Sequence, residues 1–113
     1  MKSQIMYVEQ KTDGLAGPGV ICRVQFSKTG KTIYLDGRSL QSLKGTGYKA
    51  NYFDTVTGDQ FWVSRPKKSG QDTLYSGTIV VTDDAQEEYW TEIRNRPDLI
   101  GLTKFRSHGK HQR

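Results

Sequence analysis

Cationic side chains and aromatic rings gather in the middle of the sequence, in types that suit contact with a phosphate backbone and with unpaired bases. The stretch from Lys44 to Lys68 holds five of the twelve aromatic residues, and five Lys or Arg residues against two Asp residues. Cations neutralise phosphates, and aromatic rings offer faces on which bases stack. We therefore predict a surface that binds nucleic acid, RNA or DNA, with contacts from seven residues: Lys44, Lys49, Tyr52, Trp62, Arg65, Lys67 and Lys68.

Groups that could carry catalysis are scarce. The two histidines, His108 and His111, lie near the end of the sequence, so the rest of the chain has no histidine to act as a general base or to activate Cys22. Two histidines alone do not supply enough ligands for a metal site. The Gly-rich segment 44–49 lacks the spacing of a P-loop. We therefore expect a protein that is not an enzyme, with no catalytic residue, no metal site and no cofactor.

The basic and aromatic stretch has the pattern of a β-hairpin. Residues 48–53 and 60–64 are rich in strand-forming residues, and a turn signal over residues 54–59 separates them. Pro66 ends the second arm, because proline cannot donate to a strand ladder. Aspartates in turns usually bond to their local backbone, so we assign structural roles to Asp36, Asp54, Asp59 and Asp72.

The N-terminal third also favours strands. Residues 4–10 are strand-like, and a turn with Gly30 joins two further predicted strands over 19–28 and 32–36. In the second of these three strands, strict alternation predicts one buried face, formed by Val20, Cys22, Val24 and Phe26. In the third, the same argument places Ile33 and Leu35 inward and Tyr34 outward. Residues 38–43, just before the central hairpin, fit either a short strand or one helical turn.

The C-terminal third contains both a strand and a helix pattern. Residues 78–82 favour a strand. A single α-helix is expected at about residues 84–95, because Asp83 and Asp84 are good N-caps and Pro97 stops the pattern. Its apolar stripe, which would pack on the sheet, consists of Tyr89, Trp90 and Ile93.

Short strands joined by tight turns and followed by one helix predict a mainly β fold. We expect a small, SH3-like, strongly bent antiparallel sheet or barrel with one C-terminal α-helix; an open α+β sheet is the alternative. Residues 1–103 are assigned to a single domain. Residues 104–113 carry four Lys or Arg residues and no acid, and they are expected to form a basic, disordered tail.

A resemblance to a known family covers most of residues 5–97. It is carried by the segments SLKGTGYKANYFD and EEYWTEIRNRP and by the aromatic pair Phe61–Trp62. These segments resemble a family of small bacterial proteins of about this length whose role is uncharacterised. Some members carry the name 1-deoxy-xylulose-5-phosphate synthase, but that enzyme is several times longer and binds thiamine diphosphate, for which this sequence has no site. The resemblance implies a self-contained small domain, and it supplies no catalytic residues.

Charge is unevenly distributed along the chain. Residues 1–80 carry eleven cations against six acids, whereas residues 81–103 carry two cations against six acids. A basic body attracts polyanions, which agrees with the nucleic-acid hypothesis. The alternative is a protein-binding module, such as an adaptor or a toxin-immunity protein, that uses an exposed edge strand or the acidic helix face formed by Glu87, Glu88 and Glu92. No apolar run is long enough to span a membrane. Residues 1–10 contain no apolar segment of signal-peptide length, so we expect a cytoplasmic protein. We expect a monomer or a homodimer.

Overall fold

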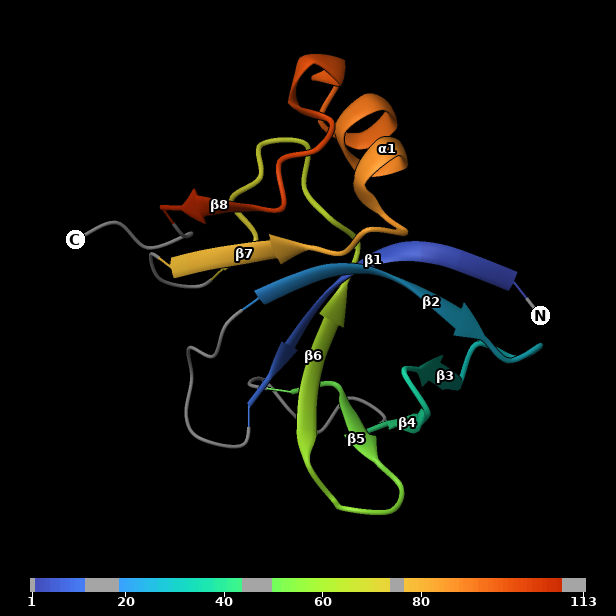
Figure 1. Cartoon of the computed structure of the whole chain (residues 1–113). Helices are drawn as coiled ribbons and strands as arrows, with labels where there is room; N and C mark the ends of the chain where they lie inside the picture. Colours follow the sequence, from blue (N-terminus) through green and yellow to red (C-terminus); the bar gives the residue numbers. More distant parts are fainter. Residues whose placement is uncertain (1, 12–18, 44–49, 74–76, 109–113) are drawn as a thin grey trace.

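The computed structural model of the chain describes residues 2–11, 19–43, 50–73 and 77–108. Within these ranges the helical segments are α1 (Gln86–Glu88), the π-helix η1 (Tyr89–Ile93) and the 3-10 helix η2 (Pro97–Leu99). The strands, shown in Figure 1, are β1 (Lys2–Gln10), β2 (Gly19–Phe26), β3 (Thr32–Leu35), β4 (Arg38–Ser42), β5 (Tyr52–Asp54), β6 (Gln60–Ser64), β7 (Gly77–Val81) and β8 (Lys104–Ser107).

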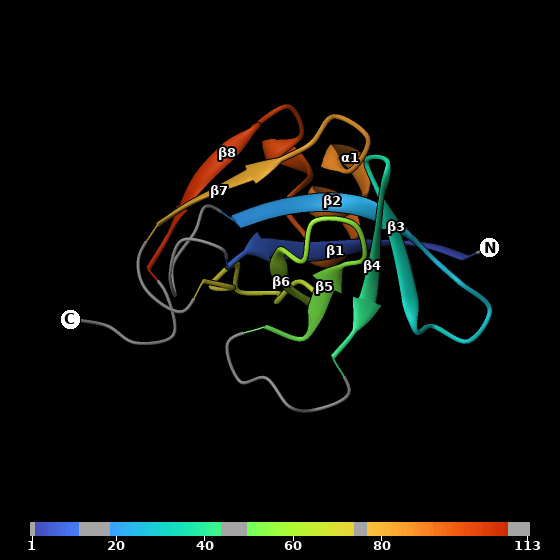
Figure 2. The same cartoon turned by 90° about the horizontal axis from the view of Figure 1, so that it is seen from below.

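Six of the strands form a closed antiparallel barrel. Their order is β1-β6-β5-β4-β3-β2, and the antiparallel pairing of β1 with β2 closes the ring (Figure 2). Strand β7 pairs in parallel with the start of β2, and β8 continues this extension as an antiparallel neighbour of β7. The prediction of a mainly β, SH3-like small barrel with a C-terminal helical segment is confirmed. The open α+β alternative is not the fold that forms.

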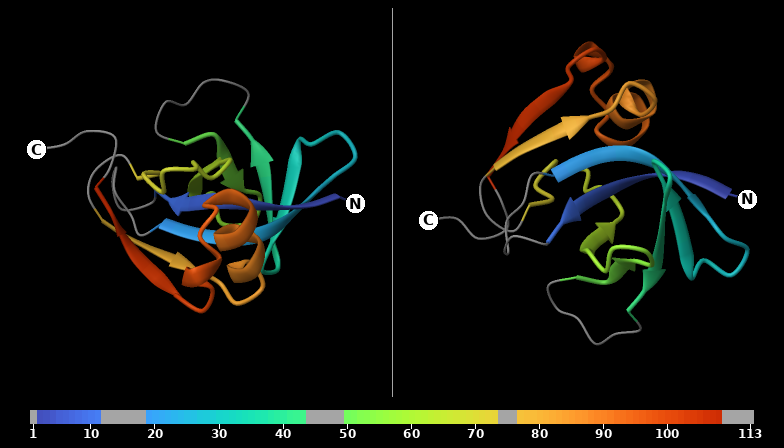
Figure 3. Two further views of the ribbon diagram at one scale, coloured as in Figure 1. Left: turned by 90° about the horizontal axis from the view of Figure 1, so that it is seen from above. Right: turned by 60° about the horizontal axis from the view of Figure 1, so that its bottom comes forward.

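The ribbon made by β1 and β2 is buried on both faces and separates two cores. On one face Ile5 and Tyr7 pack with Ile21 and with residues of β7 and η1, forming the helix-side core. On the other face Met6 and Val8 pack inside the barrel, forming the barrel core. Figure 3 shows the helical segment and the β7–β8 pair on one side of this ribbon and the rest of the barrel on the other.

The strand faces and turns follow the local sequence signals. The predicted inward face of β2 lies in or against the barrel core, and Ile33 is fully buried there while Tyr34 is exposed. Residues 38–43, for which strand and helical turn were both open, contribute β4. It is joined to β3 by Asp36 and Gly37, whose φ angles of 52° and 79° are those of a two-residue hairpin turn.

The helical segment differs from the regular α-helix predicted over 84–95. Only Gln86–Glu88 is α-helical, and the next five residues form a π-helix in which the Arg94 amide donates to the Tyr89 carbonyl. Asp83 and Asp84 do not cap it, because the N-cap position falls on Ala85. The wider turn allows the neighbours Tyr89 and Trp90 both to be buried in the helix-side core, so ring packing outweighs helix propensity here.

The expectation of a tail starting at Lys104 is wrong for its first four residues, because they form β8. Phe105 packs against the helix-side core, with its ring centroid 5.4 Å from that of Trp90 and 6.1 Å from that of Tyr89. Ser107 is fully buried, and its hydroxyl accepts a hydrogen bond from Thr73 at 2.7 Å. The ordered domain therefore continues past residue 103, and residues 109–113 of the predicted tail lie outside the described residues.

Candidate nucleic-acid interface

The two aromatic residues predicted to bind bases lie on opposite faces of the barrel wall. Tyr52 is paired with Phe61 and packs against the barrel core, and burial raises the pKa of its hydroxyl. Trp62 points the other way and packs against the helix-side core. Both rings are half-buried, so they do not form one stacking platform. Lys44 and Lys49, the first two predicted cations, fall outside the described residues.

Three of the predicted cations lie together in the segment that leaves β6. Arg65, Lys67 and Lys68 are all exposed. This segment is fixed to the body: the Asp72 carboxylate accepts a hydrogen bond from the Lys67 amide at 2.8 Å, and Gly70 lies against the Arg94 guanidinium of the segment after η1. That these three side chains contact one ligand together stays a prediction.

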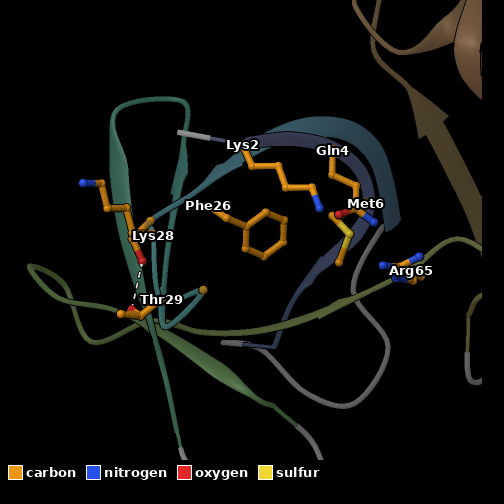
Figure 4. A pocket seen from close by; sticks show the side chains of 9 residues that line it. Lys2, Gln4, Met6, Phe26, Lys28, Thr29 and Arg65 are labelled. Carbon is orange, nitrogen blue, oxygen red and sulfur yellow. Dashed lines mark hydrogen bonds between the residues drawn. The ribbon is translucent and has the colours of Figure 1, made fainter.

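A hollow of about 670 Å³ lies beside Arg65, and we call it the β1–β2 hollow. Its lining comes from the start of β1, the end of β2, the β2–β3 turn and the chain just after β6. Nine residues form it: Lys2, Gln4, Met6, Phe26, Ser27, Lys28, Thr29, Gly30 and Arg65. Figure 4 shows seven of these with labels.

Unequal strand lengths create the hollow. Strand β1 pairs with β2 from Lys2 to Glu9, but it pairs with β6 only from Tyr7 to Gln10. The first half of the β1–β2 ribbon therefore extends beyond the end of β6 and has no pairing with it. Side chains alternate along a strand, so Lys2 and Gln4 share the face of Met6, which belongs to the barrel core.

The hollow combines an apolar floor with cationic side chains. The floor contains Met6 and the half-buried ring of Phe26, which packs against the barrel core. In Figure 4 the Lys2 side chain extends toward the space between these two residues. Arg65 lies beyond Met6, and the Lys28 side chain extends away from the ring. A ligand with a flat apolar part and a negative group would match this arrangement.

Among the residues that the structure describes, the lining holds three cations and no acid. Two arginines elsewhere in the body have carboxylate partners: Arg23 pairs with Glu88 at 2.7 Å, and Arg38 pairs with Asp54 at 2.7 Å. Hydrogen bonds from the Val56 amide, the Thr57 amide and Arg38 hold the pKa of Asp54 below its usual value. The exposed acids of the helical segment lie on the other face of the β1–β2 ribbon. No described residue of the lining therefore neutralises the positive charge of Lys2, Lys28 and Arg65.

Sequence reasoning missed Lys2, Phe26 and Lys28 as a group. The alternation of β2 placed Phe26 correctly on the inward face, and the turn placed Lys28 at the end of the hairpin. However, the pairing of Lys2 with Phe26 depends on the register of β1 against β2. Residues 11–18, which connect these strands, contain several turn signals and fix no register, so nothing local identified this proximity.

A second polar cluster lies on the opposite face of β1. Tyr7 donates a hydrogen bond to the Glu9 carboxylate, and Lys11 forms an ion pair with the same carboxylate. Glu9 is 2% exposed, so it needs both partners to offset the loss of hydration. Burial, reinforced by Glu9, raises the pKa of Tyr7. We interpret this cluster as structural, because Tyr7 and Lys11 stabilise the buried charge of Glu9.

Among the described residues there is no group of three His, Cys, Asp or Glu side chains placed to hold a metal ion. None of the helices in the same ranges has the length and apolar composition needed to cross a bilayer. No protein-family model, curated protein or solved structure matches the chain. The family resemblance noted from the sequence therefore stays a prediction.

Proposed function

We propose that the protein is a non-enzymatic nucleic-acid-binding module whose contact surface is centred on the β1–β2 hollow. The observation that carries this proposal is the lining itself: Lys2 and Arg65 lie beside an apolar floor that contains an aromatic ring, Lys28 adds a third cation at the turn, and none of the described lining residues is an acid. Small barrels that bind nucleic acid without strong sequence preference combine a basic groove with aromatic rings in this way.

Neighbouring cations extend the basic surface beyond the hollow. Lys31 directly follows the turn that lines it, and Lys67 and Lys68 follow Arg65; all three are exposed. A strand of nucleic acid lying across the hollow would therefore meet further positive charge on leaving it. The acids of the helical segment lie behind the β1–β2 ribbon, where they oppose such contact least.

The proposal is tested by paired charge removal. Fluorescence anisotropy is measured with labelled single-stranded RNA, single-stranded DNA and duplex DNA over a range of salt concentrations. Each phosphate contact to a single strand contributes about 0.7 to the slope of log affinity against log salt. Lys2→Ala/Arg65→Ala is therefore expected to weaken binding and to reduce the slope by about 1.4.

The matched control is Lys104→Ala/Arg106→Ala, which removes the same charge from β8, where both residues are exposed. It is expected to change the slope by less than half as much. A third pair, Lys67→Ala/Lys68→Ala, tests the contacts predicted from the sequence for the segment after β6. Absence of binding by the unaltered protein at low salt, or equal losses in the hollow and control pairs, would overturn the proposal.

The second candidate is a protein-binding module of the adaptor or immunity type. It is favoured by exposed apolar side chains near the β7–β8 extension: Val80, Ile100 and Leu102 are 39%, 48% and 40% exposed. Strand β8 is also the last strand in the order of the sheet, so its outer edge could accept another strand. If the protein binds no nucleic acid, this surface is the next one to test, by Val80→Lys and Leu102→Lys in a partner pull-down.

A further inference from the structure

We infer that the β1–β2 hollow is a subsite for one unpaired nucleotide, whose base stacks on Phe26 while Lys2 and Arg65 contact its phosphates. This inference rests on the proposed function and deepens it, because it names single-stranded nucleic acid as the ligand class. It also separates the residue that recognises a base from the residues that supply general affinity.

The hollow is large enough for one nucleotide. Its volume of about 670 Å³ lies within the range of roughly 300–1,000 Å³ found for sites that hold small organic ligands. A duplex exposes only base edges in its grooves, because the faces of its bases are stacked on one another. An aromatic ring on the floor of a hollow can therefore stack only on a base that is free of its duplex neighbours.

The position of the Phe26 ring is fixed by the fold before any ligand binds. It is half-buried and packs against the barrel core, and its backbone is paired with both Lys2 and Ile33. Little conformational freedom is lost when an already fixed ring contacts a ligand. Met6 beside it adds a polarizable apolar surface, which suits contact with an aromatic base.

The polar groups are arranged around this floor. Lys2 extends toward the space between Phe26 and Met6, and Arg65 lies on the far side of Met6 (Figure 4). Both cations thus lie on the Met6 side of the Phe26 ring, where they can contact the phosphates of a nucleotide whose base lies over the ring. The β2–β3 turn adds the hydroxyl groups of Ser27 and Thr29, which can bond to sugar or phosphate oxygens.

The experiment replaces the ring and keeps the charges. Phe26→Leu removes the stacking face but leaves an apolar side chain on the floor. Anisotropy is measured with a single-stranded oligonucleotide of about twelve nucleotides, with its duplex, and with an abasic oligonucleotide of equal charge. The loss of one stacked base is worth about 5- to 150-fold in affinity. Phe26→Leu is expected to weaken single-strand binding within this range and to leave binding of the abasic oligonucleotide nearly unchanged.

The matched control is Phe53→Leu, which removes another half-buried phenyl ring, on β5 and outside the hollow lining. It is expected to change affinity by less than about twofold. Phe26→Trp keeps a ring and adds a fluorophore, and its emission should be quenched by the single strand and not by the duplex. If Phe26→Leu lowers the melting temperature too far for binding to be measured, the quenching of Phe26→Trp tests whether a base stacks at position 26.

Two failures are distinguishable. If no nucleic acid binds the unaltered protein at low salt, the proposed function fails and the subsite fails with it. If nucleic acid binds in a salt-dependent way but Phe26→Leu has no effect, or the duplex and single strand bind equally, the subsite is overturned and the proposed function stands.

Discussion

At the scale of single residues, one glycine shows how closely the β1–β2 ribbon is packed. A Cβ atom on Gly19 would lie 2.4 Å from Cε1 and 2.5 Å from the hydroxyl oxygen of Tyr7. The Tyr7 ring is fully buried, and its hydroxyl is bonded to Glu9, so it cannot move aside without breaking that bond. The sequence placed Gly19 at the start of the predicted strand over 19–28 but did not predict its contact with Tyr7, because that contact depends on a side chain twelve positions earlier.

Gly19→Ala is therefore expected to destabilise the protein. Inserting a methyl group into a closely packed site typically costs about 1–3 kcal/mol. Urea denaturation gives this change in the free energy of unfolding. The control is the same substitution in a Tyr7→Leu background, where the ring tip is gone and the added cost should fall below about 0.5 kcal/mol. An unfolding midpoint equal to that of the unaltered protein would show that the strand accommodates the methyl group.

Single residues also show where prediction from sequence ends. The period of two in a strand placed Cys22, Val24 and Ile33 correctly in the barrel core, because alternation alone decides which side chains share a face. It could not decide which face of the central hairpin meets solvent. Tyr52 and Trp62 belong to different cores, since the helix-side core covers the outer face of the wall at Trp62.

At the scale of elements, turns were predictable and the helical segment was not. Gly30, Asp36 and Gly37 have positive φ angles. Glycine and aspartate are residue types that favour such turns, so the local sequence predicts them. The change from α-helix to π-helix depends on how Tyr89 and Trp90 fit against Phe105, which comes from β8. The charged composition of β8 indicated a solvated tail, and only its pairing with β7 makes it a strand.

The helical segment is expected to depend on Trp90 above all. Trp90 is 1% exposed, its ring contacts those of Tyr89 and Phe105, and its Nε1 donates to the Leu102 carbonyl at 3.1 Å. Replacing a buried Trp by Ala usually costs about 3–5 kcal/mol. Trp90→Ala should lower the free energy of unfolding by this amount, measured by urea denaturation followed by circular dichroism.

Trp62→Ala provides the comparison within the same core. Trp62 packs against that core but keeps part of its ring in solvent, so its removal should cost clearly less than the removal of Trp90. A Trp90→Ala protein with a nearly normal midpoint would mean that η1 is not held by its rings.

At the scale of the whole molecule, the shared ribbon joins the two cores into one structure. The sequence left a barrel and an open sheet as alternatives, because closure depends on pairings between distant segments. Strand β1 meets β6 more than fifty residues later in the chain, and no local pattern fixes that register. The β1–β2 hollow arises from the same unequal pairing, so a site centred on Phe26 could not be predicted before the fold was known.

Because β1 and β2 contribute to both cores, we expect damage to one core to weaken the other. Both tryptophans pack in or against the helix-side core, so their fluorescence reports on that core. Leu40 is fully buried in the barrel core, and Leu40→Ala should cost about 2–5 kcal/mol. If the molecule unfolds as one cooperative unit, this distant substitution shifts the tryptophan fluorescence transition and the circular dichroism transition together. If the cores are independent, the fluorescence transition stays at its original urea concentration while part of the circular dichroism signal is lost earlier.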